Sequence, residues 1–215
     1  MIVPIGREHL GQVARLHCAS LTGLLSELGI AAARAFYAGG IKAGSASGFV
    51  DVEQGLVRGF VFGAIHPDRL KQSVLRWNPV GTLVGTFLGI LRHPSALVWL
   101  VKSFKSPDEG SYDAQAAELT YLAVASECRS RGRGRDLVDA FTNALRAAGV
   151  RAYEVSVDDD NRQAIAFYER LGFRLIGRYR EFGILHRRYG LESHPLENNR
   201  IISPHSADAP RVAPA

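Results

Sequence analysis

Cysteine is scarce in this sequence. Its 215 residues include two cysteines, Cys18 and Cys128, which lie far apart and show no spacing that resembles a metal site. The scarcity argues against a disulfide framework and against a cysteine-based metal centre. Isolated thiols are typical of proteins in a reducing compartment, so we expect a cytoplasmic location and no metal.

Long apolar runs are also missing. The uncharged stretch from Val80 to Leu91 is followed by Arg92 and is shorter than the roughly 20 residues that a bilayer-spanning helix needs. The N-terminus shows no basic segment followed by a long apolar run, as a secretory signal would. The sequence therefore predicts neither a transmembrane helix nor a secretory signal.

Two common nucleotide-binding patterns are absent as well. The sequence has neither G-x-x-x-x-G-K-[ST] nor G-x-G-x-x-G. Its formal charge is +5, but Arg129, Arg131, Arg133 and Arg135 are crowded into one turn. Segments that bind nucleic acid usually spread their cations along a groove and interleave aromatic residues. We therefore expect no nucleic-acid partner.

The apolar residues that are present follow helical and alternating spacings, which indicates a mixed α/β fold. We expect strands at residues 2–5, 48–52, 56–65, 118–125, 152–157, 173–182 and 185–191. We expect helices at residues 7–20, 21–38 and 134–148, and a further helix that is capped by Asn161 and closed by Gly172. The Gly39-Gly40 pair should end the second helix.

We expect residues 1–192 to form one domain. Residues 66–117 lie between two expected strands and are far longer than a turn, which predicts a helical insertion between the third and fourth strands. Residues 193–215 are rich in proline, serine and alanine and have no apolar periodicity, so we expect a flexible C-terminal tail.

A basic, glycine-containing loop stands directly before the 134–148 helix. It reads Arg129-Ser130-Arg131-Gly132-Arg133-Gly134, and Arg135 extends it. Glycines let backbone N–H groups approach an anion closely, and a helix N-terminus adds partial positive charge. The loop predicts a cradle for a small phosphorylated ligand, although by itself it is also compatible with a solvated turn.

This hexapeptide fits [QR]-x-x-G-x-[GA] and resembles the pyrophosphate loop of the GNAT family of N-acetyltransferases. Residues 119–124 look like the family's central strand, and residues 155–173, VSVDDDNRQAIAFYERLGF, are similar to its second signature. The resemblance implies a GNAT fold of the α/β (α+β) class, with a mixed, largely antiparallel seven-stranded sheet flanked by helices. It also implies a V-shaped opening between strands 118–125 and 152–157, and acetyl-CoA as co-substrate.

The same resemblance assigns the binding of acetyl-CoA to Leu122, Ala123, Val124, Arg129, Ser130, Arg131, Gly132, Arg133, Gly134, Arg135 and Asn161. Backbone N–H groups of residues 131–134 would hold the diphosphate, with charge-assisted contacts from Arg129 and Arg135. The Arg133 side chain is expected to face solvent. A backbone N–H near Val124 would polarise the carbonyl, and Asn161 would bond to the pantetheine arm.

Two side chains are candidates for catalysis. Tyr168 matches the family tyrosine whose hydroxyl lies near the cofactor sulfur, and its alternative role is that of a core aromatic residue. Glu118 opens the central strand, where the histone-acetylating branch carries its base, and its alternative role is that of an ordinary exposed residue. His17 is expected to be a packed histidine, and His186 could reach the acceptor.

The acceptor stays open. The sequence is compatible with a primary amine of a small molecule such as an amino sugar, with a peptide or protein amine, and with a polyamine. A degenerate acyl-CoA-binding domain that acts as a sensor or scaffold is the non-enzymatic alternative. The insertion has three interpretations: a lid, a homodimer contact, or a membrane-surface segment at residues 79–105, where basic residues surround apolar ones.

Overall fold

A computed structural model describes residues 1–44, 46–67, 117–181 and 183–192, together with Leu70, Arg76, Phe87 and Ile90. Its helices are α1 (Leu10–Ser20), α2 (Leu24–Lys42), α6 (Arg133–Ala147) and α7 (Arg162–Arg170), with a short 3-10 turn η1 (Ser126–Cys128). Its strands are β1 (Ile2–Pro4), β2 (Ala46–Glu53), β3 (Leu56–Ala64), β4 (Ala117–Val124), β5 (Ala152–Asp158), β6 (Arg174–Glu181) and β7 (Ile184–Glu192).

These elements agree with the sequence-based expectations to within a few residues. Apart from a few single positions, the expected insertion and the expected tail lie outside the described residues, and so does the segment at 79–105 that was considered for membrane contact. No helix in the described part of the chain combines the length and the apolar character needed to span a membrane.

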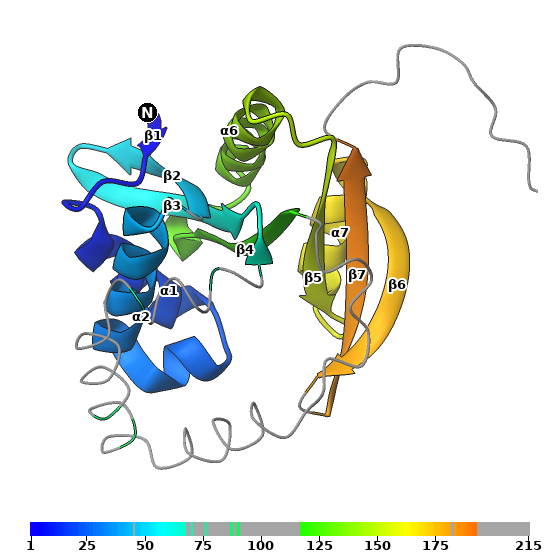
Figure 1. The fold of residues 1–215 in the computed structure, drawn as a ribbon, viewed down its shortest axis with the longest axis horizontal. Coiled ribbons are helices and arrows are strands. Elements are labelled where there is room, and N and C mark those ends of the chain that lie inside the picture. The colour runs from blue at the N-terminus through cyan, green and yellow to red at the C-terminus, as the bar shows by residue number, and fades with distance from the viewer. Residues whose placement is uncertain are drawn as a thin grey trace, which may run out of the picture.

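The described strands form one seven-stranded sheet in the order β1-β2-β3-β4-β5-β7-β6. All neighbouring strands are antiparallel except β4 and β5. The parallel pairing of β4 with β5 runs only from Ala117 to Leu119, opposite Tyr153 to Val155, and then stops. Figure 1 shows the two halves of the sheet, β1 to β4 and β5 to β6, turned relative to one another at this seam. The prediction of a mixed, largely antiparallel sheet that opens between these two strands is confirmed.

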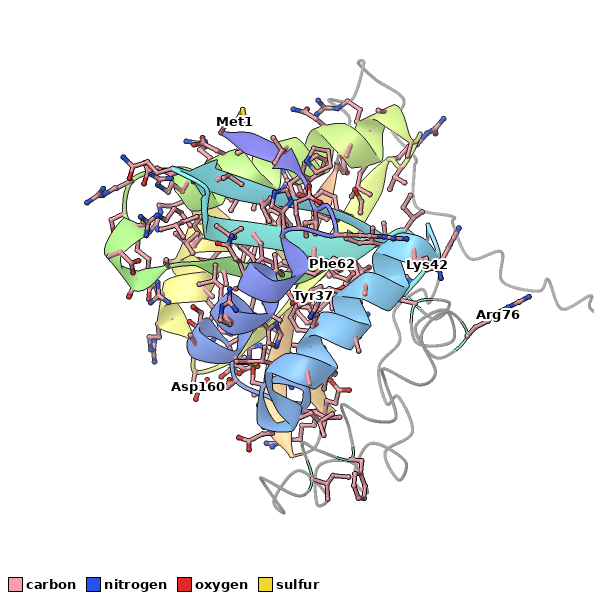
Figure 2. The ribbon with its side chains drawn as sticks, turned by 90° about the vertical axis from the view of Figure 1, so that its left-hand side faces the viewer. Met1, Tyr37, Lys42, Phe62, Arg76 and Asp160 are labelled. Atoms are coloured by element: carbon pink, nitrogen blue, oxygen red, sulfur yellow. The ribbon has the colours of Figure 1, made fainter. Side chains whose placement is uncertain are left out.

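Helices α1 and α2 cover one face of the first half of the sheet, and α6 covers the opposite face. Figure 2 looks at the face covered by α1 and α2, where Tyr37 and Phe62 meet edge to face with their ring centroids 4.9 Å apart. Because side chains alternate along a strand, Phe60 and Phe62 pack under these helices, whereas Val61 joins the core beneath α6. The strand β3 is thus buried on both sides and fixes the position of β4 beside it.

The glycine pair does not end α2, so the prediction that the helix stops at Gly39-Gly40 is wrong: the helix continues to Lys42. Gly40 instead lets the helix approach the sheet, because a Cβ atom there would lie 2.9 Å from the ring of Phe62. The helix is interrupted earlier, at Gly29, whose φ of 84° lies in the left-handed region. The sequence alone does not distinguish a glycine that packs from one that breaks a helix.

His17 is a packed histidine, as predicted. Its side chain is 1% exposed, and its Nδ1 atom lies 2.7 Å from the Tyr37 hydroxyl. Burial lowers the pKa of His17 from 6.5 to about 4, so the ring is neutral in the folded protein near neutral pH.

The burial of His17 predicts acid sensitivity. The unfolded chain binds a proton at this ring below pH 6.5, whereas the folded chain does so only near pH 4, so the free energy of unfolding should fall between these values. The loss is at most about 3 kcal/mol, at 1.36 kcal/mol per pKa unit. Urea unfolding at pH 7, 6, 5 and 4 measures it. His17→Phe should show a shallower slope over this range, and an equal slope in the variant would contradict the assignment.

Candidate functional site

A cleft of about 460 Å³ opens where the end of β4, the loop after it and α7 meet. Its lining brings together most of the predicted site residues: Leu122, Ala123, Val124, Arg129, Ser130, Gly132, Arg133, Gly134, Arg135, Asn161 and Tyr168. The predicted residues that do not line it are Arg131 and Glu118. Segments that are separated in the sequence therefore converge on one concave surface.

The basic loop has the backbone geometry of an anion-binding nest. Ser130 and Gly132 both have positive φ angles, 61° and 81°, and a single residue, Arg131, lies between them. Alternation of left-handed and right-handed residues turns successive N–H groups toward the same side. Gly132 is the N-cap of α6, so no side chain caps the N–H groups of the first helical turn, and residues 132–135 line the cleft.

Gly134 brings α6 close to α7. A Cβ atom at this position would lie 3.3 Å from the ring of Phe167, which is itself part of the cleft lining. The second glycine of the loop is thus favoured by tight packing, whereas the first is favoured by its positive φ angle.

Two arginines of the loop have defined partners. Arg129 donates from Nε to the carbonyl oxygen of Val124 at 3.1 Å and so holds the loop over the end of β4. Arg133 donates to the carboxylates of Asp51 and Glu53 on β2, and its side chain is 16% exposed. The expectation that Arg133 faces solvent is therefore wrong, because the sequence does not show which carboxylates the fold brings to it. The Arg133 guanidinium is paired with the two carboxylates of β2, and the residue also lines the cleft.

The Asp51 carboxylate is ionised in spite of its burial. Burial alone would raise the pKa of Asp51, but the hydrogen bonds from Arg133 and from the Met1 nitrogen hold that pKa below its usual value. A charged Asp51 keeps the ion pair with Arg133 intact at neutral pH.

Asn161 and Tyr168 come from one helix. Asn161 accepts a hydrogen bond from the Ala164 N–H at 3.0 Å through Oδ1, so it caps α7 as predicted and keeps its amide NH₂ as a donor at the cleft. Tyr168 is 6% exposed and packs against Phe167 and Phe173. Burial, with a contribution from Tyr153, raises the pKa of Tyr168 far above its usual value. Its hydroxyl therefore remains protonated throughout the neutral pH range.

Glu118 lies on the other side of the sheet from Leu119, which packs beneath α6. A bulge in β4 follows it, since Tyr121 pairs with Phe62 and Leu119 with Gly63, which leaves Thr120 as the extra residue. After burial, the Glu118 charge is the largest factor that raises the pKa of Tyr121 to about 12. Burial lowers the pKa of Arg188, but the Glu118 charge is among the factors that raise this pKa above its usual value. The structure thus places Glu118 beside the seam, on the face opposite the core under α6.

Sequence reasoning missed most of a polar cluster on the same face, formed by Glu154, Asp158, Tyr179, His186 and Arg188. His186 Nδ1 lies 3.0 Å from Asp158 Oδ1, and the His186 ring stacks on Tyr179 with centroids 5.1 Å apart. Arg188 lies over the Tyr179 ring and donates to Glu154 at 3.2 Å. The alternation of polar residues along β5 and β7 was the signal that could have revealed the cluster.

The model of the acetyltransferase (GNAT) family matches residues 49–173. A mycothiol acetyltransferase from Beutenbergia cavernae is 38% identical over 72 residues, which make up 34% of this chain and 24% of that protein. The match thus spans about a quarter of the length of this curated relative.

Solved structures share the fold. The ribosomal-protein-S18-alanine N-acetyltransferase from Escherichia coli is 16% identical, with 94% of this chain and 99% of that chain covered and a TM-score of 0.57. A Salmonella typhimurium protein, solved with its cofactor acetyl-CoA, is 13% identical, with 93% and 97% covered and a TM-score of 0.56. At these identities the likeness shows the fold alone, and the fold is the one that the sequence predicted. Since the family model matches more than half of the sequence, including the loop and α7, this chain belongs to the GNAT acetyltransferase family.

Proposed function

We propose that this chain transfers an acetyl group from acetyl-CoA to a primary amine of a small molecule, by direct attack of the amine on the thioester. The observation that carries this proposal is the loop at residues 129–134, which has left-handed backbone angles at Ser130 and Gly132 and lines the cleft ahead of α6. A diphosphate suits such a nest because its oxygens accept several N–H bonds at once.

The residues of the cleft fit acetyl-CoA along its length. The N–H groups of residues 131–134 bind the diphosphate, with Arg129, Ser130 and Arg135 at the edge of the site. Beyond Leu119, one side of β4 has no strand partner among the described residues, so the backbone of residues 122–124 can pair with the pantetheine arm. Asn161 donates its amide to the same arm. Acetyl-CoA, when bound, supplies the thioester that reacts.

Tyr168 and Glu118 act on protons in this proposal. Tyr168 keeps its hydroxyl proton at neutral pH and can pass it to the leaving sulfur. Glu118 lies across the seam, where a carboxylate can take the proton of the incoming ammonium directly or through water. A backbone N–H of β4, near Val124, polarises the carbonyl. The polar cluster around His186 lies on the face from which the acceptor approaches.

Replacement of Glu118 by glutamine tests its role as the base. Without the carboxylate, the amine must lose its proton to solvent, and the unprotonated fraction of an amine grows as the pH rises. We expect kcat/KM at pH 7 to fall about 100-fold, within the range typical of general bases, and the optimum to move to higher pH. Glu154→Gln, which removes a second carboxylate beside Arg188, separates base catalysis from charge. An unchanged pH profile in Glu118→Gln would show that Glu118 is not the base.

The class of acceptor is the finer part of the proposal. A small-molecule amine is the first candidate, with an amino sugar as one example, and a relative named as a mycothiol acetyltransferase supports a small-molecule acceptor. A protein amine is the second candidate, because a structural neighbour is named for the alanine of ribosomal protein S18. A catalytically degenerate domain that binds acyl-CoA as a sensor or scaffold is the third.

Two measurements separate these functions. Calorimetry tests the binding of acetyl-CoA, and a thiol-release assay then tests turnover on amino sugars, polyamines and peptides, with buffer alone as the blank. Turnover on a small amine supports the proposal, and turnover on peptides alone supports the second candidate. Binding of acetyl-CoA without turnover on any amine indicates the sensor. Absence of binding contradicts all three.

Location and assembly belong to the same proposal. The thiols of Cys18 and Cys128 are both free, which supports a reducing, cytoplasmic compartment. A homodimer is a further expectation, which sedimentation of the full chain would test.

A further inference from the structure

A chain of ion pairs joins the β2–β3 hairpin to both ends of the loop. We call it the hairpin clamp, and its members are Asp51, Glu53, Arg58, Glu127 and Arg133. Arg133 pairs with Asp51 and, at 2.6 Å, with Glu53. Arg58 lies 3.6 Å from Glu53 and 3.4 Å from Glu127, which stands in η1 at the start of the loop.

The register of the hairpin explains why these side chains meet. Asp51 pairs with Gly59 and Val52 with Val57, so Arg58 is an extra residue in β3. The carbonyl oxygen of Arg58 accepts a hydrogen bond from the Ala125 N–H at 2.8 Å, just after the end of β4. Asp51 and Glu53 are two residues apart on β2 and lie on the same face of the strand. The hairpin therefore holds the chain at residue 125, before the loop, and again at residue 133, near the end of the loop.

The two ends of the clamp differ in strength. The Glu127 side chain is 62% exposed, so its pair with Arg58 is a weak surface contact. Arg133 uses both terminal nitrogens, and its partner Asp51 is 7% exposed. Such two-point pairs of arginine with carboxylates fix direction as well as distance. Arg133 is the residue that follows Gly132, so its side chain sets the orientation of the first turn of α6.

We propose that Arg133 is a positioning residue whose pairs with Asp51 and Glu53 set the amide groups of residues 131–134 before coenzyme A binds. This inference rests on the proposed function of the loop. The role of Arg133 thus differs from the role proposed for Arg129 and Arg135, because two carboxylates already balance the charge of Arg133. The clamp acts on the affinity for coenzyme A and leaves the chemical step to other residues.

Glu53→Gln tests the proposal by the sign of its effect. If Arg133 served as a phosphate ligand, removal of a competing carboxylate would strengthen the binding of coenzyme A. If Arg133 positions the loop, the same change weakens binding, and we expect a loss of about threefold. Calorimetry with coenzyme A measures this. An affinity that rises or stays equal overturns the proposal.

Arg133→Met removes the guanidinium and keeps the apolar part of the side chain. We expect the KM for acetyl-CoA to rise about tenfold and kcat at saturation to change less than about twofold. Arg133→Lys should recover part of the loss, since it keeps one charged contact. A fall in kcat with an unaltered KM, or no recovery with lysine, contradicts the positioning role.

Asp139→Asn is the matched control, since it removes one negative charge from an exposed position of the same helix without touching the clamp. It should bind coenzyme A at least as tightly as the natural chain. Hydrogen exchange at residues 129–135 in the ligand-free protein gives a readout that needs no ligand: exchange should quicken in Glu53→Gln and not in Asp139→Asn. If the natural chain retains no coenzyme A, the proposed function fails, and exchange alone decides whether the clamp holds the loop.

Discussion

Replacement of Gly132 by valine is expected to lower the affinity for coenzyme A about 100-fold in a protein that still folds. Gly132 has a φ of 81°, and a Cβ atom there would meet nothing within 4 Å. The cost is therefore conformational: a β-branched residue is strained by about 1–3 kcal/mol in the left-handed region, and the loop relieves this strain by turning its N–H groups away from the cleft.

Gly149→Val is the matched control for this variant. Gly149 has a φ of 78° and also has no atom within 4 Å of its missing Cβ, but it stands at the far end of α6. Both variants should lose similar stability in thermal unfolding, whereas only Gly132→Val should lose coenzyme A in calorimetry. Equal retention of coenzyme A by both would remove the loop from the binding site and the acetyltransferase proposal with it.

Replacement of Tyr168 by phenylalanine is expected to lower kcat about 100-fold, the lower end of the range for a general acid. The ring is buried against Phe167 and Phe173, and phenylalanine keeps that packing. Only the hydroxyl is lost. Tyr168 lines the cleft, and its hydroxyl stays protonated at neutral pH because burial raises its pKa, so the variant lacks this proton donor. The affinity for coenzyme A should change less than about twofold, since no charge or backbone group is removed.

Tyr153→Phe is the control, because Tyr153 lies in the same core and its hydroxyl is 2.7 Å from Thr142 Oγ1, away from the cleft lining. It should lose stability and keep its turnover number. A Tyr168→Phe variant that turns over at the natural rate would make Tyr168 a core residue, which is the alternative that the sequence left open.

Local signals in the sequence were sufficient to predict the elements that surround the cleft. Asn161 before an apolar helical stripe predicted the cap of α7, and Gly149 and Gly172 both adopt the positive φ expected after a helix. Gly132 in the loop likewise adopts a positive φ, which glycine permits. In each case the residue type is dictated by its own backbone conformation, which needs no knowledge of the rest of the fold.

Long-range partners could not be predicted in this way. Arg133 is separated from Asp51 by 82 positions, and their contact depends on how β2 and α6 are placed in the fold. The left-handed Ser130 is likewise set by the turn that it belongs to, because serine does not favour that conformation by itself. The face occupied by Glu118 depends on which side of β4 packs beneath α6. The pair of Arg133 with Asp51 and the face of Glu118 follow from how the strands are aligned, which no single segment encodes.

The short pairing between β4 and β5 has a consequence for the whole domain. Three pairs of residues join the strands at the centre of the sheet, whereas β5 and β7 are joined along seven. A molecule bound between β4 and β5 would supply contacts to both strands where the strands make none with each other. Ligand binding would then couple the unfolding of the N-terminal and C-terminal halves. A bound ligand should therefore sharpen the thermal unfolding transition as well as raise its midpoint temperature.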